Sequence, residues 1–166
     1  MSDRIKHILF VCTGNICRSP FAEGLLKKLA QKNGLDDIVA DSAGLLALSG
    51  NSATSLAQKV AAEYDVDLSR HMAKSAKQDI INRSDLILAM ENSHVKNLLY
   101  DFPEAEDKVF LIRRFACFGS KDRGIADPYG LNYDAYRFCF LDIQDSVSGL
   151  AEYLSGRNGS EKESKR

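Results

Sequence analysis

The sequence predicts an α/β fold, a three-layer sandwich in which a central four-stranded parallel sheet carries helices on both faces. Short apolar runs rich in Val, Ile and Leu recur along the chain, as expected for strands that are buried on both faces. Segments with the apolar period of an amphipathic helix separate these runs. With 166 residues, 45% of them hydrophobic, the chain is long enough to build the core of one such domain. Strands that alternate with helices in this way form parallel sheets with right-handed crossovers.

The first strand is predicted at residues 5–11, and a helix follows it after a short loop. Ser19 is the expected N-cap of that helix and Pro20 its first residue, while Asn33 and Gly34 end it. The other strands are expected at residues 38–43, 85–90 and 109–112. The other helices are expected at residues 52–64, 76–82, 91–100 and 133–154, the last of them with one apolar stripe.

The loops that follow the strands are the expected location of a functional site. In a parallel α/β sheet, ligands bind beyond the carboxyl ends of the strands, and all four of these loops open on that edge. The loop after the fourth strand, residues 113–131, is irregular and contains three glycines. It is longer than the usual connection of about two to six residues, and such long loops are often functional.

Composition and charge exclude several classes of protein. A net charge of −1 and a charged fraction of 27% are typical neither of a nucleic-acid-binding protein nor of a disordered chain. The apolar stretches fall well short of the roughly 20 residues that cross a bilayer, and the N-terminus lacks a signal-peptide pattern. We therefore expect a cytoplasmic monomer with reduced cysteines that binds neither nucleic acid nor membrane. One domain is expected over residues 1–155, followed by a polar, disordered tail over residues 156–166.

The loop after the first strand combines a thiol with an anion-binding backbone. Amides of a loop that wraps onto a helix N-terminus form an anion site, and the helix dipole strengthens it. Arg18 can add a bidentate fork to two phosphate oxygens. The same field favours the thiolate form of Cys12, which makes it a candidate nucleophile, and Ser19 can donate its hydroxyl to that thiolate. Gly14 and Asn15 are residue types that tolerate left-handed backbone conformations.

Other interpretations of this loop are weaker. A cysteine at the end of a buried strand is most often a small core residue, but the strand, the Gly-Asn pair and the Ser-Pro helix start favour function here. A nucleotide-binding P-loop needs a second glycine followed by lysine, which this loop lacks. Cys17 lies five positions after Cys12, so a reversible disulfide between them would protect the thiolate from over-oxidation. The other Cys and His residues lack zinc-ligand spacing, so we expect no metal and no cofactor.

Cleavage of a phosphate ester also needs an acid that faces this loop. A phenolate or alkoxide leaves poorly unless it receives a proton. Asp127, which Pro128 follows in the long irregular loop, is the best candidate. A plain β-turn is the alternative, because Asp-Pro followed by Gly is typical of one. His7 and His94 are expected to be ordinary surface or edge residues.

The segment VCTGNICRSP at residues 11–20, together with DPY at residues 127–129, resembles the low-molecular-weight protein tyrosine phosphatases. The resemblance covers about residues 1–155 and implies their phosphotyrosine phosphatase I-like fold. It also implies that Cys12 attacks phosphorus to form a phosphocysteine, that Arg18 stabilises the transition state, and that Asp127 protonates the leaving oxygen and then activates water. The implied phosphate site consists of Cys12, Thr13, Gly14, Asn15, Ile16, Cys17 and Arg18. The residues that match positions holding this loop in shape are Asn15, Ser19, Ser42 and His71.

The same resemblance bears on the substrate. It implies that Tyr129 lines the entrance and stacks on an aromatic substrate, and that Leu45 or Leu48 replaces the bulky aromatic rim residue of eukaryotic members. The Leu-rich segment at residues 44–50 is similar to that of the bacterial branch associated with tyrosine kinases of exopolysaccharide assembly. This implies a phosphotyrosine protein as substrate, with such a kinase as a candidate. Gly130 stands where many relatives carry a second aromatic residue, which leaves the rim more open.

Three alternatives stand beside a tyrosine phosphatase. Protein-arginine phosphatases are similar but tend to carry Thr where Ile16 stands, and a β-branched apolar side chain suits a flat phenyl ring. Arsenate reductases share the fold and the loop, but they need two further cysteines after the third strand, and none occurs between Cys17 and Cys117. A non-catalytic phosphate-binding module would have no use for both Cys12 and Asp127.

Overall fold

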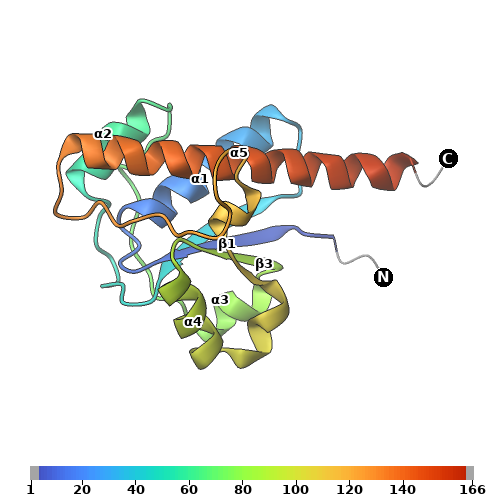
Figure 1. Cartoon of the computed structure of the whole chain (residues 1–166), viewed down its shortest axis with the longest axis horizontal. Helices are drawn as coiled ribbons and strands as arrows, with labels where there is room; N and C mark the ends of the chain where they lie inside the picture. The colour runs from blue at the N-terminus through green and yellow to red at the C-terminus, as the bar shows by residue number, and fades with distance from the viewer. Residues whose placement is uncertain (1–3, 164–166) are drawn as a thin grey trace.

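The computed structural model describes residues 4–163, with side chains as far as residue 156, and its centre is a four-stranded parallel sheet (Figure 1). The strand order is β2-β1-β3-β4. The strands are β1 (His7–Cys12), β2 (Val39–Gly44), β3 (Leu86–Ala89) and β4 (Val109–Leu111). All four predicted strands are present, with ends that differ by one or two residues. The register places Cys12 at the end of β1 directly beside Gly44 at the end of β2.

Helices cover both faces of the sheet, which confirms the three-layer α/β fold. In Figure 1 the upper layer contains α1 (Arg18–Lys32), α2 (Ser55–Ala62) and α5 (Tyr133–Glu163). The lower layer contains α3 (Gln78–Arg83), α4 (Asn92–Asp101) and the 3-10 helix η1 (Pro103–Lys108). A second 3-10 helix, η2 (Ile112–Phe115), follows β4. No helix of the described chain is both long and apolar enough to cross a membrane.

The alternation of side chains along β1 produces two cores. Ile8 and Phe10 point into the larger core beneath α1 and α5, while Leu9 and Val11 point into the smaller core above α3 and α4. Both sets are almost fully buried, which explains why the strand is apolar at every position. The sheet edge that carries the loops is thereby held between two packed layers.

Several predicted helix ends differ from the structure: α2 begins at Ser55 instead of residue 52, and two other differences have a physical cause. The first helix begins at Arg18 with Cys17 as its N-cap, because the Ser19 side chain lies inside the first turn and bonds to loop residues there. The closing helix passes the predicted end at residue 154 and continues to Glu163. Its apolar stripe does end near Leu154, but an established helix gains one further hydrogen bond for each added residue.

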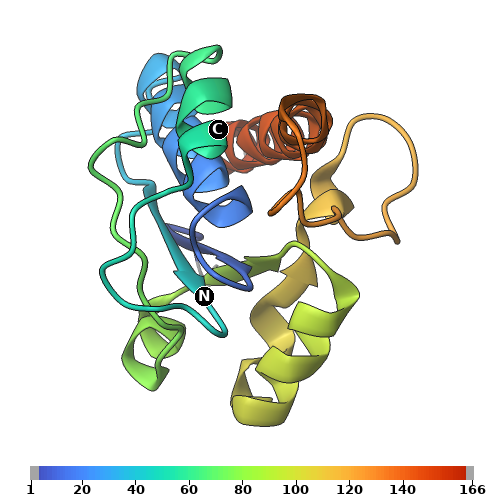
Figure 2. The ribbon, with the colours of Figure 1, turned by 90° about the vertical axis from the view of Figure 1, so that its left-hand side faces the viewer.

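The carboxyl edge of the sheet faces the viewer in Figure 2. The loop that follows β1, blue in this view, lies near the centre. The segment after β2 flanks it on one side, the orange segment before α5 lies on the other, and α4 lies below. Loops that are far apart in the sequence therefore meet around the end of β1, as the rule for parallel α/β sheets predicts.

Candidate active site

Residues 12–18, the phosphate loop, connect β1 to α1 and turn sharply at Asn15. Asn15 is fully buried and adopts φ 56°, whereas Gly14 is not among the residues with positive φ. The Asn15 amide nitrogen Nδ2 donates to Ser19 Oγ at 2.8 Å and to Ser42 Oγ at 2.9 Å. His71 Nε2 donates to the Asn15 carbonyl at 2.7 Å. The structure thus gathers the four residues predicted to support the loop around a single left-handed position.

Hydrogen-bond donors surround the Cys12 thiol. Its Sγ atom lies 2.9 Å from Ser19 Oγ and receives the backbone N–H of Asn15 at 3.3 Å. Because Ser19 Oγ already accepts from Asn15, its own hydrogen is free to point at the sulfur. Ser42 Oγ in turn donates to Glu23 Oε1 at 2.6 Å, which extends the network away from the site. A hydroxyl group and a backbone N–H therefore both lie within hydrogen-bond distance of the Cys12 sulfur.

Arg18 is buried, yet one of its donors has no protein partner. The Nη1 group donates to Glu91 Oε2 at 2.8 Å and to the Ile125 carbonyl at 2.7 Å, and Nη2 lies 3.4 Å from Asp127 Oδ2. Nε, by contrast, is one of two buried side-chain polar atoms of the described chain without a hydrogen bond. Burial opposes the charge of Arg18, but the hydrogen bond to Glu91 and the charges of Cys12 and Asp127 outweigh it and raise its pKa. A fixed cation with a free Nε–H is suited to bind an oxyanion.

Asp127 lies at the mouth of the pocket with its side chain 43% exposed. Its Oδ1 accepts the backbone N–H of Tyr129 at 3.0 Å, while Oδ2 faces Arg18. The two interpretations of this residue are therefore compatible, because one oxygen shapes the turn and the other faces the phosphate loop. The segment that leads to Asp127 is anchored at Ile125, whose N–H donates to the Met90 carbonyl at 2.7 Å.

These side chains enclose a pocket of about 190 Å³. Its walls are formed by Cys12, Thr13, Gly14, Ile16, Cys17, Arg18, Asp127 and Tyr129. Most predicted phosphate-site residues therefore share one pocket with the proposed acid, and Asn15 lies behind the wall. The lining does not include Leu45 or Leu48: Leu45 packs against the smaller core, and Leu48 is 70% exposed.

His94 is not the ordinary surface or edge residue that was expected. It is buried, its Nε2 lies 2.8 Å from Thr13 Oγ1, and its Nδ1 accepts the N–H of Glu91 at 3.2 Å. Nδ1 is therefore the acceptor and Nε2–H the donor. Burial, followed by the charge of Arg18, lowers the pKa of His94, which favours the neutral ring.

Glu91 and His94 together form a capping box at the start of α4. Sequence reasoning assigned neither of them to the site, because Glu-x-x-His is not the Ser/Thr-x-x-Glu/Gln pattern that identifies a capping box in a sequence. Their contacts with Arg18 and Thr13 also join distant parts of the chain.

Cys17 lines the pocket and contacts two hydroxyl groups behind it. Its Sγ atom lies 3.3 Å from Tyr136 Oη and 3.6 Å from Thr54 Oγ1. Burial raises the pKa of the Cys17 thiol, and the hydrogen bonds from Tyr136 and Thr54 offset this in part. All four cysteines are free thiols. Pairing of Cys17 with Cys12 stays a prediction.

Comparison with known proteins agrees with this geometry. Residues 7–160 match the family model described as low molecular weight phosphotyrosine protein phosphatase. The chain is 36% identical over 152 residues to the low molecular weight protein-tyrosine-phosphatase Wzb of Salmonella typhi, covering 92% of this chain and 96% of that protein. It is 35% identical over 147 residues to a protein-arginine-phosphatase of Geobacillus stearothermophilus, covering 89% and 95%.

A solved structure extends the comparison to a bound ligand. Wzb of Vibrio vulnificus in complex with benzylphosphonate superposes with a TM-score of 0.80 at 32% identity, over 90% of this chain and 99% of that one. The fold, the sequence motifs and the family match all agree. The chain belongs to the low molecular weight phosphotyrosine protein phosphatase family.

Proposed function

We propose that the chain hydrolyses phosphotyrosine in proteins, and small aryl phosphates, in two steps through a phosphocysteine. In the first step, the Cys12 thiolate forms an S–P bond while the P–O bond to the phenol breaks, and Asp127 gives its proton to the departing oxygen. In the second step, Asp127 takes a proton from a water molecule whose oxygen attacks phosphorus. The S–P bond then breaks, the Cys12 thiolate is restored, and inorganic phosphate leaves.

The observation that carries this proposal is the convergence of three groups on one pocket. Cys12, Arg18 and Asp127 all line the same 190 Å³ space, and Nε of Arg18 has no hydrogen-bond partner among the described residues. Ser19 supports the thiolate at 2.9 Å. The guanidinium is held in place by Glu91, so binding of the transition state needs little reorganisation.

Ile16 and Tyr129 favour an aromatic phosphoester over phosphoarginine. Both line the pocket, and both present apolar surface to a flat ring. The relative in complex with benzylphosphonate supports the same choice, because a benzyl group resembles the tyrosine side chain. The arginine alternative is kept as the second candidate, since a protein-arginine-phosphatase is 35% identical to this chain.

The Leu-rich segment at residues 44–50, which resembles that of the branch associated with tyrosine kinases, supports a finer proposal. We infer that the protein substrate is a bacterial tyrosine kinase and that the enzyme acts as a monomer. The four free thiols favour the cytoplasm as its compartment. We also propose that residues 1–155 suffice for catalysis, because Leu154 is the last buried residue of α5 among those whose side chains the structure describes.

The deciding experiment is steady-state hydrolysis of matched phosphotyrosine and phosphoarginine peptides in the presence of EDTA, with Cys12→Ser as the blank. We expect a clear preference for phosphotyrosine and no activity in the blank. A preference for phosphoarginine would transfer the assignment to the second candidate. Equal activity of Cys12→Ser and the unaltered enzyme would overturn the mechanism itself.

A further inference from the structure

A second cavity adjoins the phosphate loop outside the catalytic pocket. Its volume is about 250 Å³, compared with 190 Å³ for the pocket. The segment after β2 forms one wall with Leu45 and Leu46, and α4 forms the other. Thr13 lines both spaces. Since each residue of an extended chain spans up to about 3.3–3.6 Å, the neighbours of a residue held in the pocket lie within reach of this cavity.

The α4 wall of the cavity carries a polar stripe. Ser93, Asn97 and Asp101 all line it and follow one another at intervals of four, so they lie on one face of the helix. The stripe ends in a carboxylate at the last residue of α4, where the helix dipole is also negative. Next to it, the ring of Tyr100 is 88% exposed. One end of the cavity is therefore suited to a cation.

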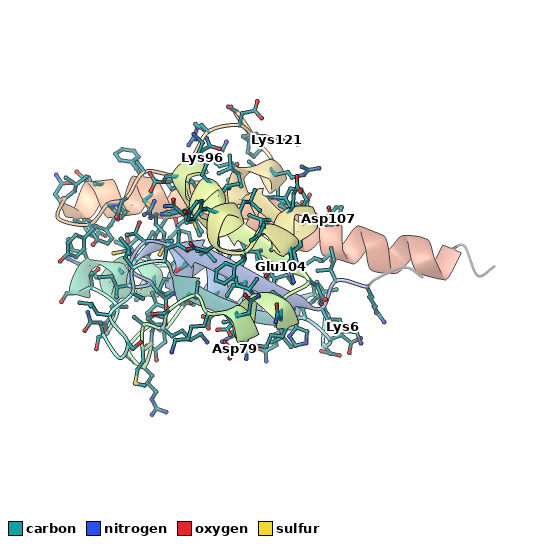
Figure 3. The ribbon with its side chains drawn as sticks, turned by 90° about the horizontal axis from the view of Figure 1, so that it is seen from below. Lys6, Asp79, Lys96, Glu104, Asp107 and Lys121 are labelled. Atoms are coloured by element: carbon teal, nitrogen blue, oxygen red, sulfur yellow. The ribbon has the colours of Figure 1, made fainter. Side chains whose placement is uncertain are left out.

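The chain that continues from this helix end is acidic, although none of its carboxylates after Asp101 lines the cavity. Four acidic residues and no Lys or Arg occur between residues 97 and 107. Figure 3 shows two of these acidic residues, Glu104 and Asp107, on the side of the molecule that carries η1. The next basic residue, Lys108, directs its Nζ at the carbonyls of Ile81 and Ser84.

We propose that this cavity is a substrate subsite that binds a Lys or Arg side chain close to the phosphorylated residue. The inference rests on the proposed function, because it assumes a phosphorylated polypeptide in the pocket. The aliphatic stem of the basic side chain packs on Leu45 and Leu46, and its charged head reaches Asn97 and Asp101. The exposed Tyr100 ring adds a cation–π surface.

Other side chains fit this cavity less well. A leucine would cover the polar stripe of α4 without forming hydrogen bonds to it, which costs free energy. A glutamate would meet the carboxylate of Asp101 and the negative end of the helix dipole. A long basic residue matches both walls.

The test is a scan of phosphotyrosine peptides in which Lys, Met or Glu occupies, in turn, each of the three positions on either side of the phosphotyrosine. We expect Lys at one position to raise kcat/KM about three- to fivefold over Met, the size of one partly exposed ion pair. Asp101→Lys is expected to abolish that preference and to favour Glu at the same position. Asp79→Lys, on α3, makes the same change of net charge outside the cavity and should leave the preference intact.

Hydrolysis of p-nitrophenyl phosphate separates this inference from the proposed function. All variants should hydrolyse it equally, because it has no flanking residue to fill the cavity. If the unaltered enzyme fails on this substrate, the proposed function is wrong. If it succeeds but the Lys preference is absent, or survives in Asp101→Lys, the subsite is refuted.

Discussion

The two loops that form the pocket obtain their shape in different ways. The phosphate loop is mostly buried and is held by short hydrogen bonds to the ends of strands and to α1, centred on Asn15. Residues 116–132, the acid loop, run over the surface and are tied to α5 by charged groups. The phosphate loop is therefore held by the sheet edge, whereas Asp127 lies on a segment that is held by salt bridges to α5.

Two arginines tie the acid loop to α5. Arg113 is buried and donates to Asp142 Oδ1 at 2.8 Å, and also to the carbonyls of Phe118 and Ser120 in the loop. Arg123 forms a bidentate pair with Asp142 at 2.7 and 2.8 Å. After these contacts with α5 the loop returns to the active site, where Arg18 donates a hydrogen bond to the Ile125 carbonyl.

If Asp127 supplies only the proton, the decrease in kcat that follows removal of its carboxylate should depend on how easily the leaving group departs without a proton. We expect Asp127→Ala to lower kcat on phenyl phosphate by about 10²- to 10⁴-fold, the usual size of general-acid catalysis, and to have a smaller effect on p-nitrophenyl phosphate. Asp122→Ala removes a carboxylate from the same loop and is the matched control. An equal loss on both substrates would remove Asp127 from this role.

The salt bridges and hydrogen bonds that attach the acid loop to α5 should also contribute to the free energy of unfolding. Arg113→Met leaves two aspartates and two loop carbonyls without their buried partner. We expect the free energy of unfolding to fall by about 3 kcal/mol, as for other broken buried pairs. Arg123→Met breaks a half-exposed pair with the same Asp142 and should cost no more than about 1 kcal/mol. Urea unfolding measures the free energy of unfolding of both variants. Similar losses in the two would contradict the larger contribution assigned to the buried Arg113.

The phosphate loop, in contrast, should be sensitive to small displacements. A Cβ atom at Gly44 would lie 2.7 Å from the Thr13 carbonyl oxygen and 2.9 Å from the Asn15 nitrogen. Because both are backbone atoms, the loop itself must move, and a shift of about 1 Å in a site can cost 10²-fold in rate. We expect a loss of that order in kcat/KM for Gly44→Ala. Gly156→Ala, where nothing lies within 4 Å, should be unaffected.

The smallest effect concerns the pH dependence of stability near the phosphate loop. Burial lowers the pKa of His94 below its ordinary 6.5, so the unfolded chain binds more protons than the folded one at pH values between the two pKa values. The His94 contribution to stability is therefore complete above pH 6.5 and is lost as the pH falls towards the folded-state pKa, by at most about 1.4 kcal/mol per pH unit.

His94→Gln removes this titration. Its unfolding free energy should be about 1 kcal/mol lower than that of the unaltered enzyme at pH 8, because a hydrogen bond is lost. The difference should narrow towards pH 5. Parallel pH curves from urea unfolding would show that His94 does not titrate in this way.

The sequence was informative wherever the signal was local. Apolar runs located all four strands, and Asn15 was identified as a residue that tolerates the left-handed conformation that it adopts. The missed features join distant parts of the chain: Arg18 to Glu91, Thr13 to His94, and Cys17 to Tyr136. Periodicity and motif spacing carry no information about such contacts, since these depend on how the layers pack. Layer packing also decides the position of Leu45. This residue was predicted at the substrate rim, but it packs against the smaller core and does not line the pocket.

We propose that the two loops act in turn on one phosphoryl group, which Cys12 carries between the two steps. In Asp127→Ala, the base that activates water is missing, so the covalent intermediate should accumulate with an activated aryl phosphate. Rapid acid quench followed by peptide mass spectrometry measures it directly. We expect a phosphoryl group on the peptide that contains Cys12, and none on that peptide in Cys12→Ala, which has no nucleophile at this position. Turnover without any phosphoenzyme, or with the phosphoryl group on another residue, would contradict the two-step mechanism.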